Sequence, residues 1–280
     1  MQKVTEKDIS FVIVTFKSNK QVYRCLHSLP KDSPKIIVEN SNDTDFKSKL
    51  EIDFVNLDCY LMNQNLGYGA GNNFGIEKCK TKYAMILNPD VKFKENTTSE
   101  ILDIININDF DIGAPINFED KKLYKFNKKK MMDADYIKGF AIIVKKDFFL
   151  KYKFDENFFL YMEEIDLCKR IKIDKKKLFL LNVAVDHIGG LSHGERDNFE
   201  MEKSRNWHWM WSNFYYYKKY NGYLFAFFKT FPNFINCLLK YFIFSIFRKE
   251  QKKTKYKMRF LGLLNSYLLN KSFYRPYDFS

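Results

Sequence analysis

Short apolar runs rich in β-branched residues alternate with helical patterns near the start of this chain. This alternation restricts the fold more than any other feature. The runs are Ile9–Phe16, Lys35–Val38, Asp58–Met62 and Tyr83–Leu87, and helical patterns fill gaps between them at Asn19–Ser28 and Gly71–Lys80. Continuous apolar runs are typical of strands buried on both faces, and strands joined through helices form parallel sheets. We predict an α/β fold with a mostly parallel sheet flanked by helices.

Polar residues stand where these strands end. In open α/β sheets, ligands bind beyond the carboxyl ends of the strands. Further strands are predicted at Gly139–Val144 and Leu178–Val183, and Asp186-His187 follows the second of these. The candidate ligand-binding residues at the strand ends are Thr15, Glu39, Asn40, Asn65, Asn88, Asp90 and His187.

Two of these residues are candidate metal ligands. Asp90 follows Asn88-Pro89, and the proline ends the strand so that the carboxylate projects at the edge of the sheet. A carboxylate there suits Mg²⁺ or Mn²⁺ bridged to phosphates, although an ordinary Asn-Pro-Asp turn has the same residues. His187 stands before Gly189-Gly190, where it is either a metal ligand or a structural histidine.

Asn65–Gly75 (NLGYGAGNNFG) is rich in glycine. The dinucleotide-binding template GxGxxG fails because Asn72 takes the place of its last glycine, and the segment does not follow the first strand. Closely spaced glycines at the start of a helix still allow the backbone to approach a ligand.

A cluster of acids marks Phe154–Arg170 (FDENFFLYMEEIDLCKR). On a helix, Glu163, Asp166 and Arg170 share one face. Acids gather at helix N-termini because the helix dipole favours them there, so these residues fit a structural role as well as a catalytic one.

The C-terminal part differs in composition. Trp207–Tyr220 is dense in aromatic residues, and Tyr223–Phe247 is mostly apolar but interrupted by Lys229, Pro232 and Lys240. Arg248–Arg259 follows with seven cations and one acid. This pattern predicts helices lying in the plane of an anionic membrane surface; a helical subdomain with a solvated basic face is the alternative. We expect two parts, residues 1–200 and 201–280.

The net charge of +13 indicates a polyanionic partner. A nucleic-acid-binding protein is one alternative, but the densest basic run adjoins an apolar stretch rather than interleaving with aromatics. Five scattered cysteines without a CxxC pair fit a reducing cytosol, and the polar start MQKVTEKDIS has no secretory leader. We expect a cytoplasmic protein, peripheral on the inner face of the cell membrane, with no nucleic-acid partner.

Taken in order, these segments resemble family 2 glycosyltransferases with the GT-A fold, in particular the rhamnosyltransferase-like branch of bacterial polysaccharide assembly. The matching segments are Phe11–Phe16, Val38–Ser41, Asn65–Gly75, Asn88–Val91, Gly139–Val144, Phe154–Arg170, His187–Ser192, Arg205-Asn206 and Phe260–Leu269. The resemblance implies an inverting, metal-dependent enzyme. It would move a sugar from a UDP-, dTDP- or GDP-sugar to a glycan acceptor, carried on polyprenyl diphosphate, in cell-surface polysaccharide synthesis.

The resemblance also implies residue roles. Thr15 and Glu39 would lie at the nucleoside, although the family usually has aspartate at the position of Glu39. Asp90 would be the last residue of the metal-binding DxD motif, in which Asn88 replaces the first acid, and His187 would complete that site. The nucleotide-sugar pocket would be lined by Asn65, Gly67 and Gly69.

Glu163-Glu164 replaces the usual Glu-Asp, which makes Glu164 the expected catalytic base; Glu163 and Asp166 remain alternatives. Asp166 and Arg170 would support the acceptor side. We expect a low pKa for a carboxylate at a helix N-terminus. A non-catalytic homologue remains a further alternative because Asn88 and Glu164 depart from the pattern. A nucleotidyltransferase would need a glycine-rich loop after the first strand, where residues 17–25 have no glycine.

Overall fold

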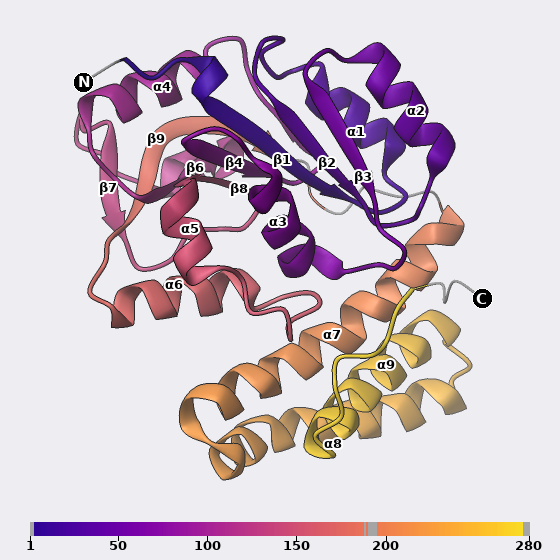
Figure 1. The fold of residues 1–280 in the computed structure, drawn as a ribbon. Helices are drawn as coiled ribbons and strands as arrows, with labels where there is room; N and C mark the ends of the chain where they lie inside the picture. The colour runs from indigo at the N-terminus through magenta and orange to yellow at the C-terminus, as the bar shows by residue number, and fades with distance from the viewer. Residues whose placement is uncertain (1–2, 188, 190–194, 277–280) are drawn as a thin grey trace. The chain divides into compact units, whose positions relative to one another are not determined.

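The computed structural model describes residues 3–187, 189 and 195–276 (Figure 1). The chain divides into two compact units. Residues 1–154 and 164–192 form the first, here called the sheet unit, and residues 155–163 and 193–280 form the second, called the helical unit. Composition predicts a division near residue 200, but it does not assign residues 155–163 to the helical part.

The described part of the sheet unit contains a nine-stranded sheet. Its order is β3-β2-β1-β4-β8-β6-β9-β5, and β7 also pairs with β9. The strands are β1 (Ile9–Thr15), β2 (Lys35–Glu39), β3 (Leu57–Leu61), β4 (Tyr83–Leu87), β5 (Val91–Lys92), β6 (Ile112–Asn117), β7 (Met131–Ala134), β8 (Ala141–Lys145) and β9 (Leu178–His187).

The first four strands are all parallel, as predicted. The other half of the sheet is mixed: β8 runs antiparallel to β4 and β6, β6 is parallel to β9, and β5 and β7 are antiparallel to β9. The pairing of β5 with β9 places the turn after β4 beside the end of β9, although about a hundred residues separate them in sequence.

Alternate residues of β1 face two separate hydrophobic clusters. Phe11 and Ile13 pack with side chains of α1 (Asn19–Leu26), α2 (Thr44–Asp53) and α4 (Thr97–Ile107). Val12 packs with α3 (Gly67–Lys78), α5 (Lys146–Tyr152) and α6 (Glu163–Ile173). Figure 1 shows these two groups of helices on opposite sides of the sheet. Because both faces are covered, β1 needs apolar residues at nearly every position.

Two glycines of the glycine-rich segment serve helix packing rather than ligand approach. A Cβ atom at Gly75 would lie 2.4 Å from Cγ1 of Val12, and one at Gly71 would lie 2.8 Å from Cγ1 of Val14. Larger residues would push α3 away from β1. The glycine spacing is therefore explained in part by the contact between α3 and the sheet.

The six predicted strands and two predicted helices are present, with ends shifted by a few residues. Apart from the helix of the acidic segment and the helices of the C-terminal part, the other elements were not predicted. The helix α2 buries only Phe46 and Leu50, and the strand β6 contains a glycine and a proline, so neither has the usual apolar pattern of its class. Two short 3-10 helices, Glu6–Asp8 and Phe118–Leu123, complete the sheet unit.

Three long helices form most of the helical unit: α7 (Glu195–Asn221), α8 (Tyr223–Ile246) and α9 (Glu250–Tyr267). Phe214 of α7, Cys237 of α8 and Leu263 of α9 meet in one hydrophobic cluster. At Gly262 a Cβ atom would lie 2.3 Å from the carbonyl oxygen of Trp207, so this glycine allows α9 to approach the backbone of α7.

One face of α8 is apolar and exposed. Seven residues at spacings of three or four positions form this stripe: Leu224, Phe228, Phe231, Ile235, Leu239, Phe242 and Ile246. Leu224 and Phe228 are each 70% exposed, and Ile246 is 77% exposed. Among the helices of the described residues, none has the length and apolar character needed to cross a bilayer.

Candidate active site

The two predicted metal ligands meet at one edge of the sheet. Strand β5 pairs with β9 so that Val91 lies opposite His187, which brings the preceding residue, Asp90, beside the imidazole. Oδ1 of Asp90 lies 3.3 Å from Nε2 of His187. The ring of His187 stacks on Phe140 with centroids 4.6 Å apart. Asn117 accepts a hydrogen bond from the backbone N–H of His187 at 3.3 Å, so both the ring and the backbone of this histidine are held.

This pair fits a divalent cation. A carboxylate oxygen and a neutral imidazole nitrogen are ligands for Mn²⁺, and the carboxylate alone also suits Mg²⁺. Across the described residues, no set of three or more His, Cys, Asp or Glu side chains is arranged to hold a metal ion. An ion here would need further oxygen ligands from phosphate or water. In the predicted segment His187–Ser192, Ile188 and residues 190–192 lie outside the described residues.

Asn88 stands at the end of β4, beside the Asp90–His187 pair. Its backbone N–H donates to the carbonyl of Phe140 at 2.8 Å, and its carbonyl accepts from Val91 at 3.1 Å. These bonds form the turn that carries Asp90 from β4 to β5.

The ends of β1 and β2 are joined by a hydrogen bond from the backbone of Asn40 to the carbonyl of Thr15, at 2.9 Å. The hydroxyl oxygen of Thr15 is buried and has no hydrogen-bond partner among the described residues. Glu39 is also buried, and its carboxylate accepts the backbone N–H groups of Ser41 at 2.9 Å and Asp43 at 2.8 Å. Glu39 therefore shapes the loop after β2, a role that its strand-end position did not reveal.

The start of α3 is connected to the end of β2. Asn40 donates to the carbonyl of Gly67 and accepts from the N–H of Leu66, both at 3.4 Å. Asn65 accepts from the N–H of Gly67 at 3.0 Å. Gly67 has a φ of +79°, which glycine adopts without strain, and Gly69 in the first turn of α3 is buried. Four predicted pocket residues, namely Asn40, Asn65, Gly67 and Gly69, therefore lie in one region.

The acidic segment becomes helical at Glu163, as predicted. The two preceding residues, Tyr161 and Met162, have φ values of +69° and +72°. Left-handed backbone costs residues other than glycine about 1–3 kcal/mol each and persists where the surroundings enforce it. This turn redirects the chain so that Glu163 and Glu164 occupy the first turn of α6.

Glu164 is partly exposed and lies beside Gly139, where an added Cβ would be 3.6 Å from the Cβ of Glu164. The hydroxyl of Tyr68 donates to the carbonyl of Gly139. Tyr68 and Gly139 thus form part of the surroundings of Glu164. Neither was predicted as a site residue, although Tyr68 lies inside the glycine-rich segment and Gly139 opens a predicted strand.

Burial raises the pKa of Glu164, and this corrects the expectation of a low pKa. Hydrogen bonds from the backbone N–H groups of Glu164 and Ile165 act in the opposite direction, but the loss of hydration is the larger effect. The pKa-lowering effect expected at a helix N-terminus is therefore smaller than the pKa-raising effect of packing around Glu164.

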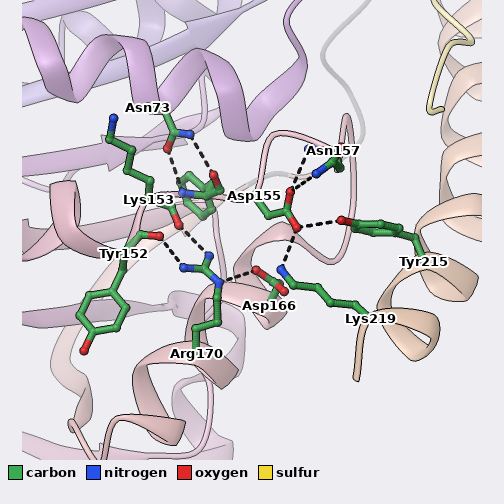
Figure 2. Close-up of polar contacts among 10 residues, drawn as sticks. Asn73, Tyr152, Lys153, Asp155, Asn157, Asp166, Arg170, Tyr215 and Lys219 are labelled. Carbon is green, nitrogen blue, oxygen red and sulfur yellow. Dashed lines mark hydrogen bonds and ion pairs between the residues drawn. The ribbon is translucent and has the colours of Figure 1, made fainter. Parts of the chain in front are cut away.

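The predicted shared face of Asp166 and Arg170 is present (Figure 2). Asp166 is completely buried, and Nε of Arg170 donates to it at 2.7 Å. The other guanidinium nitrogens donate to the carbonyls of Tyr152 and Lys153, the latter at 2.6 Å. Arg170 therefore braces the chain before the acidic segment, and Asp166 is its buried counter-ion.

The three acids considered as the base thus have different environments. Glu163 is 4% exposed, Asp166 is 0% exposed, and only Glu164 remains partly open to solvent. Exposure favours Glu164, as its place in the motif does.

Sequence reasoning missed a second brace, formed by Asn73. Its side chain accepts from the backbone N–H of Phe154 and donates to the carbonyl of Phe154, each at 2.9 Å (Figure 2). A buried asparagine in the middle of a helix needs such partners, which was the available signal.

Residues 10–173 match the family model described as glycosyl transferase family 2. The chain belongs to this family. Two curated relatives are similar to it. Agl10 of Haloferax volcanii, a low-salt glycan biosynthesis hexosyltransferase, is 22% identical over 199 residues, covering 61% of this chain and 64% of its own length. The rhamnosyltransferase WbbL of Escherichia coli K12 is 23% identical over 239 residues, covering 71% and 89%.

Solved structures share the fold. TarS residues 1–349 of S. aureus has a TM-score of 0.53 at 12% identity, with 90% of each chain covered. Its complex with UDP has a TM-score of 0.52 at 11% identity, covering 92% of this chain and 90% of that one. GalNAc-T7 with UDP, GalNAc and Mn²⁺ has a TM-score of 0.54 at 15% identity, covering 64% and 42%. The predicted family and the GT-A fold are confirmed; this chain spans less than two thirds of the length of Agl10 and of GalNAc-T7.

The first prediction concerns the brace. Replacing Arg170 with methionine leaves Asp166 buried without its counter-ion, which should lower the free energy of unfolding by about 3 kcal/mol. Urea denaturation measures the loss. Lys172→Met is the matched control, because its ion pair with Asp135 is exposed to solvent and should contribute little to stability. Equal losses in the two variants would contradict the brace.

The second prediction uses the raised pKa of Glu164. Between its unfolded value near 4.5 and its higher folded value, the folded protein binds more protons than the unfolded one. The resulting stability is present below the unfolded pKa and lost as pH rises through the folded pKa. Glu164→Gln should therefore raise the melting temperature at about pH 8, and the gain should shrink toward zero near pH 4.

Calorimetry at both pH values measures this difference, with Glu100→Gln as the control at an exposed position in the first turn of α4. A gain that is independent of pH would show that ionisation of Glu164 is not its cause.

Proposed function

We propose that this chain is an inverting glycosyltransferase that moves a sugar from a nucleotide-sugar donor to a hydroxyl of a glycan acceptor in cell-surface polysaccharide synthesis. The observation that carries the proposal is the Asp90–His187 pair at the edge of a sheet whose unit also carries the partly exposed Glu164. Membership of family 2, relatives named as hexosyl- and rhamnosyltransferases and similar folds bound to UDP support it.

At the donor end, Thr15, Asn40, Asn65, Gly67 and Gly69 would line the site for a UDP-, dTDP- or GDP-sugar. The buried hydroxyl of Thr15 is available to a ligand group, because no described residue satisfies it. Glu39 would act by shaping the adjacent loop. Asp90 and His187 would hold Mg²⁺ or Mn²⁺, which when bound neutralises charge on the diphosphate leaving group. Asn88 would contribute through the turn that positions Asp90.

At the acceptor end, Glu164 would take the proton from the attacking hydroxyl. That hydroxyl attacks the anomeric carbon from the face opposite the diphosphate, so the configuration inverts. Burial raises the pKa of Glu164, and a carboxylate with a raised pKa is a stronger base than an ordinary one. Arg170 and Asp166 would keep the start of α6 in place for this step.

We also propose that the helical unit lies on the inner face of the cell membrane. The exposed stripe of α8 presents apolar side chains along the helix, and the Arg248–Arg259 run adds seven cations and one acid. Apolar residues entering the interface and cations near anionic headgroups are the two elements of an in-plane anchor. An acceptor carried on polyprenyl diphosphate would be present at the same surface.

The third prediction tests the donor site. One of UDP, dTDP or GDP should raise the melting temperature in the presence of Mn²⁺ or Mg²⁺, because a ligand that binds only the folded state stabilises it. Asp90→Ala and His187→Ala should abolish the metal-dependent part of the shift. Asp186→Ala is the matched control, since Asp186 adjoins His187 in β9 but pairs with Lys94.

Release of the nucleoside diphosphate from the matching sugar nucleotide then tests the reaction. Glu164→Gln should slow release by about a hundredfold or more while leaving the nucleotide shift unchanged. A chain that none of the three nucleotides stabilises would refute the proposed donor site.

The fourth prediction tests the membrane contact. A triple variant with glutamate at Phe228, Leu239 and Phe242 should no longer sediment with phosphatidylglycerol vesicles. Charged side chains would then replace the apolar ones that enter the membrane interface. Glutamate at Ile52, Val55 and Ile107, which are exposed apolar residues of the sheet unit, should leave sedimentation unchanged. These substitutions are preferable to truncation before Tyr223, which would uncover Phe214 of α7. Retained sedimentation of the α8 variant would refute the anchor.

A further inference from the structure

A cavity of about 340 Å³ lies within the helical unit, and none of the residues assigned to the transfer reaction line it. Its walls come from residues 156–157, from α7 and from the chain that leaves α9. The volume falls in the range of pockets that hold one small ligand group.

The charge of the lining is positive. Lys218, Lys271 and Arg275 line the cavity, and Glu156 is the one acidic residue among the described residues that line it. Within the described part of the chain, neither Lys218 nor Lys271 forms an ion pair. Two lysines thus line one small cavity without a counter-ion among the described residues, an arrangement that favours an anionic ligand.

The neighbouring acid, Asp155, does not neutralise these lysines. Its carboxylate accepts from Lys219 at 2.7 Å, from the hydroxyl of Tyr215 at 3.1 Å and from Asn157 (Figure 2). These contacts hold the pKa of Asp155 below its usual value against the opposing effect of burial. Asp155 is therefore paired with Lys219 beside the cavity and does not line it.

The third cation is held in position. The guanidinium of Arg275 lies 3.8 Å from the centroid of the Phe159 ring and donates to the carbonyls of Ser272 and Tyr274. A guanidinium fixed by stacking and hydrogen bonds loses little further freedom when it binds an anion. Beside these polar groups, Trp211 and Phe214 supply an apolar side to the cavity.

We propose that this cavity binds a phosphate-bearing group, either on a lipid headgroup or free. Convergent cations with amide and hydroxyl donors are the usual means of binding phosphate. The apolar side would accept carbon atoms attached to that phosphate. In the proposed function, the cavity would be a subsite for the phosphate of a membrane-bound acceptor, and this role rests on that function. Binding of phosphate by the cavity does not depend on the transfer reaction.

Isothermal titration calorimetry of the full chain tests the site, with EDTA present so that no divalent cation at Asp90 retains the probe. The probes are inorganic pyrophosphate and farnesyl diphosphate. The double variant Lys218→Met/Lys271→Met should bind either probe about tenfold or more weakly, because two charge-assisted contacts are lost. The control Lys175→Met/Lys176→Met removes the same charge from exposed residues of the sheet unit that do not line the cavity, and it should stay within about twofold of the unmodified chain.

The two probes separate the sources of the phosphate. Binding of farnesyl diphosphate about tenfold or more tighter than pyrophosphate would assign the cavity to a lipid headgroup, and equal binding would assign it to a free phosphate. Equal losses in the two double variants, or no binding of either probe, would overturn the site. Thermal melting verifies that each variant is folded. If the cavity variant loses binding but the unmodified chain releases no nucleoside diphosphate from any sugar nucleotide, the proposed reaction is rejected and the phosphate site is retained.

Discussion

The geometry of the acidic segment depends on the guanidinium of Arg170. One side chain binds the buried Asp166 on its own helix and the carbonyls of Tyr152 and Lys153 in the preceding chain. Removing two charges from water is costly, and a buried ion pair often adds little net stability. What such a pair provides is a fixed arrangement, since each of the three guanidinium nitrogens of Arg170 donates to a different acceptor. The first turn of α6, with Glu163 and Glu164, follows from that arrangement.

The same environment distinguishes three carboxylates that are nearly adjacent in sequence. Asp166 is neutralised by Arg170, Glu163 is buried, and Glu164 alone combines partial exposure with a raised pKa. A raised pKa means that the ionised form is disfavoured in the folded protein, so readiness to accept a proton is accompanied by a loss of stability at neutral pH. The left-handed residues Tyr161 and Met162 add a further local cost beside the same acid. Strain and an unfavourable charge at one place are typical of a functional site.

Sequence patterns predicted what local rules control. Because β1 is covered on both faces, its residues form a continuous apolar run, which predicted a buried strand. Positions at strand ends predicted Asp90 and His187 as site residues. Contacts between distant segments were not readable. Asn73 binds Phe154 across 81 positions, and the burial that raises the pKa of Glu164 comes from packing that overrides the helix dipole. The strand-end position of Glu39 predicted it as a site residue. Its hydrogen bonds with the backbone of Ser41 and Asp43 are visible only in the structure.

The acidic segment also joins the two units of the chain. Phe154 is bound by Asn73 in the sheet unit, whereas the next residue, Asp155, is bound by Lys219 and Tyr215 in the helical unit. The chain returns to the sheet unit at Glu164, so the proposed base is the first residue after the crossing. Residues 155–163 thus belong to the helical unit, whereas Arg170 and its partners Asp166, Tyr152 and Lys153 all lie in the sheet unit.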